Sequence, residues 1–181
     1  MTKTKFISLA AAISLALTFT SCGGSKPAPE PSTSPRIELL KIANTQYAQH
    51  YVGIGQYTSN SERVAANASA VDARNQLAIG IGSEIVGLAK LNAADADAKA
   101  AEAYMDDILE KVKQSLTNVR IQDIRMEKEQ DNYKIYTLVT VPKDDALRTV
   151  KKLASTEEAI GNALGAKAIM NIIDSELDKY R

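Results

Sequence analysis

The sequence predicts an α+β fold, in which long helices pack on a small antiparallel sheet, for a single domain over residues 36–181. In several long segments the apolar residues recur every three or four positions, as they do on one face of an α-helix. Residues 51–57 and 119–141 are instead rich in β-branched and aromatic side chains, which favour strands. Because an Asp-Asn turn interrupts residues 119–141, we expect them to form a hairpin, which makes the sheet antiparallel.

Residues 1–21 have the organisation of a secretory signal peptide. A short basic start is followed by an uncharged apolar run from Phe6 to Phe19 and by the small pair Thr20-Ser21. This run is shorter than the roughly 17–25 residues that a membrane-spanning helix requires. We therefore expect the segment to be cleaved rather than kept as an anchor.

Cys22 follows that small pair and is the single cysteine of the chain. This order is typical of a lipoprotein, so we expect lipidation at Cys22, which becomes the mature N-terminus. The alternative is an ordinary signal peptide with an incidental cysteine. A disulfide and a thiolate metal site are excluded, since both require further cysteines or ligands.

Residues 22–35 predict a lipidated cysteine followed by a flexible tether. Four of the five prolines of the chain fall between Gly23 and Pro35, in a stretch that is too polar and too rich in proline to bury apolar surface. We expect this tether to hold the domain away from the lipid surface.

The charge balance argues against a nucleic-acid partner. The chain has 22 basic and 22 acidic residues, and cleavage after residue 21 removes two lysines, which leaves a net charge near −2. Binding to phosphates requires a basic surface, and the sequence has no basic stripe.

The domain is expected to begin with a helix over residues 36–48, with Pro35 in its first turn. Its apolar positions are Ile37, Leu40, Ala43 and Tyr47. In the strand 51–57, Gly53 and Gly55 leave one side nearly bare, which allows the backbone of another element to come close.

A long helix is expected next, opened by a capping box of Ser59 and Glu62. Its apolar positions are Val64, Ala68, Val71, Ile81, Ile85 and Leu88. Gly80 and Gly82 lie inside this helix, and we attribute them to close packing on the strand. The alternative of a phosphate-binding loop is disfavoured, because the segment lacks the Lys-Ser/Thr ending of a P-loop and does not match the dinucleotide fingerprint.

After a break at residues 91–95, a second helix is expected to end near residues 117–118. Its apolar positions are Ala101, Tyr104, Ile108, Val112 and Leu116. The apolar residues of the first hairpin strand then change parity, so we expect an irregularity near Gln122-Asp123. The second strand, 133–141, is apolar on both faces, and either a helix on each face or a second copy of the chain must cover it.

The chain is expected to end in helices. Pro142 ends the strand, and Asp144-Asp145 suits the first turn of a helix with Leu147, Val150 and Leu153. Ser155 and Glu158 have the spacing of a second capping box, which predicts a new helix there. The apolar stripe of that helix comprises Ala166, Ile169, Met170, Ile173, Leu177 and Tyr180.

No set of residues in the sequence converges on catalysis. His50 is the one histidine, which we interpret as a surface or packing residue. Ser83 lacks the glycine two positions later that a nucleophile elbow requires. The pairs Asp95/Asp97 and Asp106/Asp107 are interpreted as solvated helix faces, without the spacing of a calcium loop. We expect no catalytic residues, no metal site and no cofactor.

Three motifs follow one another along the chain: a Val-Gly-Ile-Gly strand at 52–55, an alanine-rich helix and a hairpin end at 136–143. The helix contributes Ala66, Ala70, Asp72-Ala73-Arg74 and Leu77-Ala78. In this order the motifs resemble the Lpp-twenty-like family of twenty-kilodalton bacterial outer-membrane lipoproteins, which is related to the N-terminal domain of a flagellar assembly protein. The resemblance implies an α+β domain and an envelope lipoprotein without known catalytic residues, linked to surface or flagellar structures.

These observations predict a non-enzymatic, lipid-anchored structural or protein-interaction module, whose partner is another protein or a second copy of the chain. Because no aspartate follows Cys22, we expect it at the outer membrane, facing the periplasm. The alternative is a small-ligand binding or carrier protein that uses a groove between the glycine-bearing strand and the long helix.

Overall fold

The computed structural model describes residues 34–92, 95–116, 118–158 and 163–180, which all belong to one compact unit. The signal peptide, Cys22 and the tether lie outside the described residues. The elements run in the order α1 (Pro35–Gln46), β1 (His50–Ser59), α2 (Glu62–Asn92), α3 (Asp95–Ser115), β2 (Arg120–Glu129), β3 (Asn132–Pro142), α4 (Lys143–Glu158), α5 (Ala163–Leu177) and the 3-10 turn η1 (Asp178–Tyr180).

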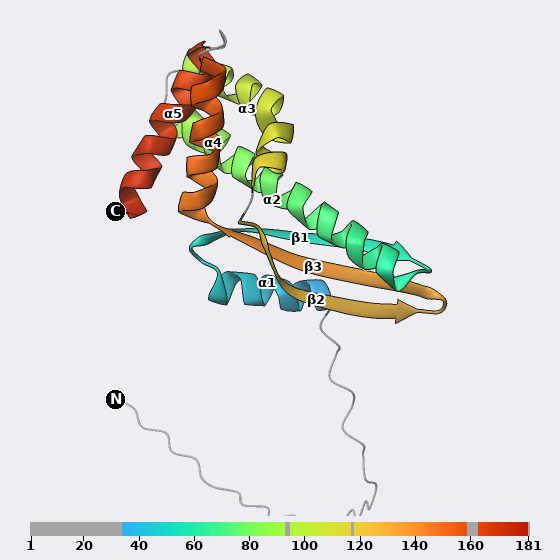
Figure 1. Ribbon diagram of the computed structural model, residues 1–181. Helices are drawn as coiled ribbons and strands as arrows, with labels where there is room; N and C mark the ends of the chain where they lie inside the picture. Colours follow the sequence, from blue (N-terminus) through green and yellow to red (C-terminus); the bar gives the residue numbers. More distant parts are fainter. Residues whose placement is uncertain (1–33, 93–94, 117, 159–162, 181) are drawn as a thin grey trace, which may run out of the picture. The chain divides into compact units, whose positions relative to one another are not determined.

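The predicted α+β class is confirmed, since the described residues form five α-helices and a three-stranded antiparallel sheet packed against helices. The strand order is β1-β3-β2, so β3 is central and β1 and β2 are the edges. In Figure 1, α2 lies along one face of the sheet and α1 along the other, while α3, α4 and α5 gather at the end opposite the hairpin turn. None of the described helices is long and apolar enough to cross a membrane.

The central strand is covered on both faces by helices of the same chain, which was one of the two predicted arrangements. Thr137, Val139 and Val141 face α2, and Thr137 shares a hydrogen bond of 2.7 Å with Ser69 of that helix. Tyr136 and Leu138 point to the other face, where they pack with Leu39 and Ala43 of α1. Each residue of β3 from 135 to 141 is therefore buried.

The two glycines of β1 permit a direct backbone contact with α2, as predicted. A Cβ atom added to Gly53 would lie 2.0 Å from the carbonyl oxygen of Ala73, and one added to Gly55 would lie 2.1 Å from the amide nitrogen of Ala73. No real Cβ atom approaches backbone this closely. The small residues Ser69 and Ala73 complete the contact from the helix, so the strand and the helix touch without large side chains between them.

The explanation for the two helical glycines was wrong. A Cβ atom at Gly80 would meet nothing within 4 Å, and one at Gly82 would meet Met105 and Leu109 of α3 at 3.4 and 3.5 Å rather than the strand. Gly80 is exposed. Only Gly82 lies at a helix contact, and that contact is with α3.

The apolar stripes predicted for the first two helices were also partly wrong. In α2, Val64 and Val71 are exposed, and the buried positions of the first turns are Ala65, Ser69 and Ala73. In α1, Ile37 and Leu40 are exposed and Leu39 is buried. In α2, close packing on the glycines of β1 selects small side chains, which a search for large apolar residues passes over.

Both predicted capping boxes were wrong. Ser59 is the last residue of β1, paired with Tyr133, and its hydroxyl accepts the N–H of Ser61 at 3.2 Å, while α2 begins at Glu62. Ser155 lies inside α4, where its hydroxyl donates to the carbonyl of Lys152 at 2.8 Å. This back-bonding within a helix uses the same residue type as a cap, so spacing alone does not separate the two. The last helix begins at Ala163.

The irregularity in β2 is confirmed as a bulge between Ile121 and Asp123. The register pairs Ile121 with Val139, Ile124 with Thr137 and Met126 with Ile135. The hairpin turn falls at Gln130-Asp131, one residue earlier than predicted, and Gln130 has a φ of 54°.

Candidate functional site

The bulge in β2 gathers three apolar side chains on one face of the sheet. Residues directly opposite each other in an antiparallel pair point to the same side, so Ile121, Ile124 and Met126 share the face of β3 that carries Val139, Thr137 and Ile135. Without the extra residue, Ile121 would point to the opposite face. We call these three side chains the β2 row.

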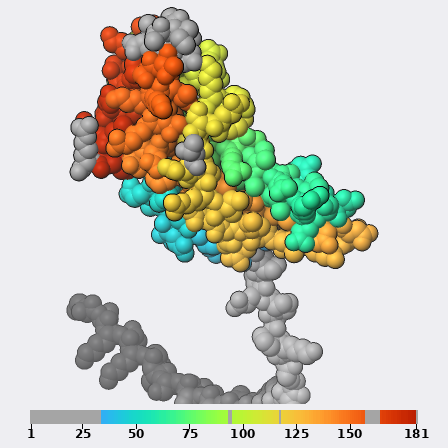
Figure 2. All heavy atoms as spheres, in the orientation of Figure 1, coloured from blue at the N-terminus to red at the C-terminus, as the bar shows by residue number. Residues whose placement is uncertain are grey.

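The β2 row lies beside α2 but is not covered by it, because α2 packs on β1 and β3. The exposed fractions of Ile121, Ile124 and Met126 are 46%, 48% and 50%. Figure 2 shows the residues of β2 at the surface of the visible face, coloured gold. Among the residues that the structure describes, no strand pairs with the outer edge of β2. An uncovered apolar row on an unpaired strand edge is a surface suited to binding another chain.

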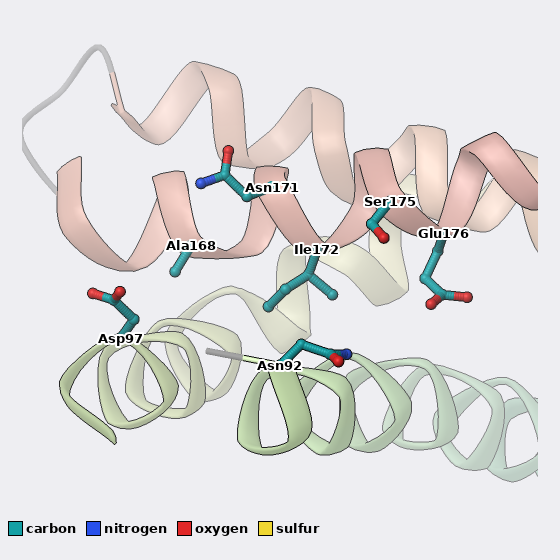
Figure 3. Close-up of a pocket in the computed structure, with 7 residues that line it drawn as sticks. All are labelled: Asn92, Asp97, Ala168, Asn171, Ile172, Ser175 and Glu176. Carbon is teal, nitrogen blue, oxygen red and sulfur yellow. The ribbon is translucent and has the colours of Figure 1, made fainter. Parts of the chain in front are cut away.

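A second candidate is a pocket of about 440 Å³ between α5 and the junction of α2 with α3. In Figure 3, Ile172 points from α5 toward Asn92 at the end of α2, while Asp97 and Glu176 lie to either side. The lining residues carry amide, hydroxyl and carboxylate groups but no histidine, cysteine or lysine. Glu176 forms an ion pair with Lys179, with 2.6 Å between the carboxylate oxygen and the ammonium nitrogen. The pocket can hold a small polar molecule, and its lining contains no nucleophile with an adjacent base.

A third candidate surrounds a polar triad between β1, α2 and the start of α4. The hydroxyl of Tyr51 donates to Glu84 at 3.2 Å, and the ammonium of Lys143 lies 3.3 Å from the same carboxylate and 5.1 Å from the centre of the Tyr51 ring. Burial of Tyr51, and then the charge of Glu84, raise the pKa of its hydroxyl above the ordinary value of 10.0. The hydroxyl and the ammonium both bind the carboxylate of Glu84, so we interpret the triad as a polar link between β1, α2 and α4.

The groove that sequence reasoning placed between the glycine-bearing strand and the long helix does not exist at Gly53 and Gly55. There the backbones of β1 and α2 are in contact, which leaves no space for a ligand. A hollow of about 430 Å³ does lie further along α2, beside Gly80, Tyr51 and Glu84. This hollow is open to solvent, and its charged groups, Glu84 and Lys143, are paired with each other in the triad.

The other residues singled out in the sequence are dispersed. His50 is the first residue of β1, and its ring meets Tyr47 edge-on at 5.5 Å between centroids. Ser83, Asp106 and Asp107 are exposed on α2 and α3. Within the described ranges, no group of three or more histidine, cysteine, aspartate or glutamate residues is placed to hold a metal ion.

Asp144 and Asp145 lie in the first turn of α4, as predicted. Asp145 also accepts a hydrogen bond from Asn118 at 2.9 Å, which ties the start of α4 to the segment before β2. Asp97 is the one predicted carboxylate that lines the pocket of Figure 3, and sequence reasoning had assigned it to a solvated face.

Comparison with models of protein families and with curated proteins finds no match for this chain. The assignment of a role therefore depends on the residues themselves.

Proposed function

We propose that this chain is a lipid-anchored protein of the bacterial envelope, whose α+β domain acts as a non-enzymatic interaction or structural module. Cys22, behind a signal peptide, supplies the anchor, and residues 23–35 supply the tether. The resemblance to outer-membrane lipoproteins and the absence of an aspartate after Cys22 favour the outer membrane and the periplasmic side.

The observation that carries the interaction role is the uncovered β2 row on an open sheet edge. A domain of this size can bury most of its large apolar side chains, and this domain buries the central strand β3 on both faces. Three half-exposed apolar residues aligned on one edge strand, next to an unpaired backbone, are best explained by a protein that binds there.

The anchor is tested in the native host by mass spectrometry of the N-terminal peptide and by membrane fractionation. The wild-type protein is expected to carry acyl chains on Cys22 and to fractionate with the outer membrane. Cys22→Ser is expected to keep the fold but to leave the membrane fraction. An unmodified Cys22, or an uncleaved leader in the wild type, would contradict the proposal.

The interaction role is tested with a photo-crosslinking residue at Met126, compared with the same residue at Val71. Val71 is exposed to a similar degree, 55%, but lies on α2 away from the sheet. We expect Met126 to capture a protein in intact cells and Val71 not to do so. Equal capture, or none from Met126, would refute the interaction role.

A second candidate function is the binding of a small polar ligand in the pocket of Figure 3, which its size and its convergent polar groups favour. A thermal-shift screen with envelope metabolites tests it, because a ligand that binds the native state raises the melting temperature by mass action. Ser175→Leu, which fills the pocket, should abolish any such shift. Shifts that survive this substitution would arise elsewhere.

A further inference from the structure

We propose that the hollow beside Gly80 is a binding site for a neutral carbohydrate, whose hydroxyl groups bind Glu84 and Lys143 while its carbon skeleton packs on small apolar residues. No residue of the β2 row lines this hollow, so the inference does not depend on the interaction role of β2. It follows from a glycine that the packing does not explain, from the composition of the lining and from the balance of its charges.

The packing of the domain does not explain Gly80. This residue is exposed inside α2, and a Cβ atom added to it would meet nothing within 4 Å. Glycine inside a helix is less favourable than alanine, so a glycine without a packing partner calls for another reason. Gly80 lines the hollow of about 430 Å³. The missing side chain keeps this space free and lets a bound molecule come close to the helix backbone.

The end of α1, the start of β1, the middle of α2 and the start of α4 meet at the hollow. Its volume falls within the range of about 300–1,000 Å³ that is usual for small-molecule pockets. The lining combines small apolar residues with polar side chains, which are Ala43, Ala48 and Val52 on the one hand and Asn44, Glu84 and Lys143 on the other. A carbohydrate has the same two characters, because its ring carbons carry apolar C–H groups and its rim carries hydroxyls.

The charges of the hollow favour a neutral ligand. Glu84 and Lys143 are of opposite sign and lie 3.3 Å apart, so the lining has no net charge to attract an anion or a cation. A zwitterion would have to separate the two side chains in order to pair with both. A neutral molecule avoids that cost.

The ion pair can bind hydroxyl groups without being broken. The side chains of Lys143 and Glu84 are 23% and 38% exposed. An ammonium group has three donors and a carboxylate about four acceptor positions, and the contacts of this pair with each other and with Tyr51 occupy only part of them. A hydroxyl group accepts from the ammonium and donates to the carboxylate. A ligand rich in hydroxyl groups therefore suits this site.

The site is tested by saturation-transfer NMR with the full-length lipoprotein in a detergent that has no sugar headgroup. The probes are maltotriose, cellotriose and triacetylchitotriose, and we expect at least one of them to receive saturation from the wild type. Gly80→Leu, which fills the hollow, should abolish this signal. Gly87→Leu should keep it, because Gly87 also has open space around its added Cβ but does not line the hollow. No signal from any probe, or a signal that both variants keep or both lose, would overturn the proposal.

The chemical class is tested with trigalacturonate, an anionic trisaccharide, and with glycylglycine, a zwitterion. We expect each to bind with a dissociation constant at least threefold higher than that of the best neutral trisaccharide. Tighter binding of either probe, lost in Gly80→Leu, would overturn the assignment to neutral carbohydrates.

The α1 side of the site is tested with Asn44→Ala, which removes an exposed amide from the lining. It should weaken binding of the neutral trisaccharide at least threefold. Asn67→Ala, at an exposed asparagine of α2 that does not line the hollow, should leave the affinity unchanged. Equal affinities of the two variants would overturn the placement of the ligand. Failure of these experiments leaves the interaction role of β2 intact, since that role is tested by capture at Met126.

Discussion

The most constrained residues of this domain are the two glycines of β1. At Gly53 and Gly55 the backbone of α2 occupies the space that a side chain would need, with distances near 2 Å from an added Cβ. The helix and the strand are both fixed by the rest of the core, so neither can retreat without opening other contacts.

We predict that Gly53→Ala destabilises the domain by about 3 kcal/mol or more, because overpacking against backbone forces α2 away from the sheet. Urea denaturation followed by circular dichroism measures this change. Gly80→Ala is the matched control in α2, where the added methyl group meets nothing within 4 Å. It should stabilise the domain by about 0.5–1 kcal/mol through helix propensity. If both substitutions have similar effects, the close contact at Gly53 is not real.

We predict that the ionisation of Tyr51 lowers the free energy of unfolding at alkaline pH. Its pKa in the folded state lies above the unfolded value of 10.0, because burial and the carboxylate of Glu84 oppose ionisation. Below pH 10 both states hold the proton and the contribution is complete. Above pH 10 the unfolded state loses its proton first, so stability falls by about 1.4 kcal/mol per pH unit for this group.

The measurement is the free energy of unfolding between pH 8 and pH 11 for the wild type and for Tyr51→Phe. The variant lacks the titrating hydroxyl, so its stability should fall less steeply with pH. Tyr57→Phe is a control at an exposed tyrosine of the same strand. Parallel curves for the wild type and Tyr51→Phe would show that Tyr51 does not contribute in this way.

Among the elements, α1 packs on the face of the sheet opposite α2 through only two buried residues. Leu39 and Ala43 are its buried side chains, and they pack with Tyr136 and Leu138 in a cluster separate from the main core. A small cluster of this kind depends strongly on each large side chain that it contains.

We predict that Leu39→Ala lowers the free energy of unfolding by about 2–5 kcal/mol, since it removes the one large side chain of α1 that is fully buried. Amide hydrogen exchange should show α1 opening before the strands. Leu40→Ala, at a neighbouring residue that is 44% exposed, should change stability by less than about 0.5 kcal/mol. Equal effects of the two substitutions would mean that α1 does not pack through Leu39.

At the scale of the whole molecule, α2 joins two regions of the domain. Its first half lies on β1 and β3, and its second half continues into the helical cluster with α3 and α5 (Figure 1). Since β1 and β3 occupy the surface under α2, the outer strand β2 is left with its apolar row uncovered.

Sequence reasoning succeeded where a feature depends on neighbouring residues. The types and order of the elements, the bare side of β1 at Gly53 and Gly55, and the bulge before Asp123 all follow from local composition and alternation. The capping-box prediction failed at Ser59 and Ser155. A serine hydroxyl can bind nearby backbone groups at a strand end, inside a helix or at a helix start, and the Ser-x-x-Glu spacing does not distinguish these places.

The sequence by itself determined that the apolar residues of β2 change parity, and hence that the strand contains an irregularity. Only the tertiary structure decided that Ile121, Ile124 and Met126 are left half-exposed on one face. The physical reason is that exposure depends on where α2 crosses the sheet. The position of α2 is fixed by its backbone contact with β1, and β1 ends more than 60 residues before β2 begins.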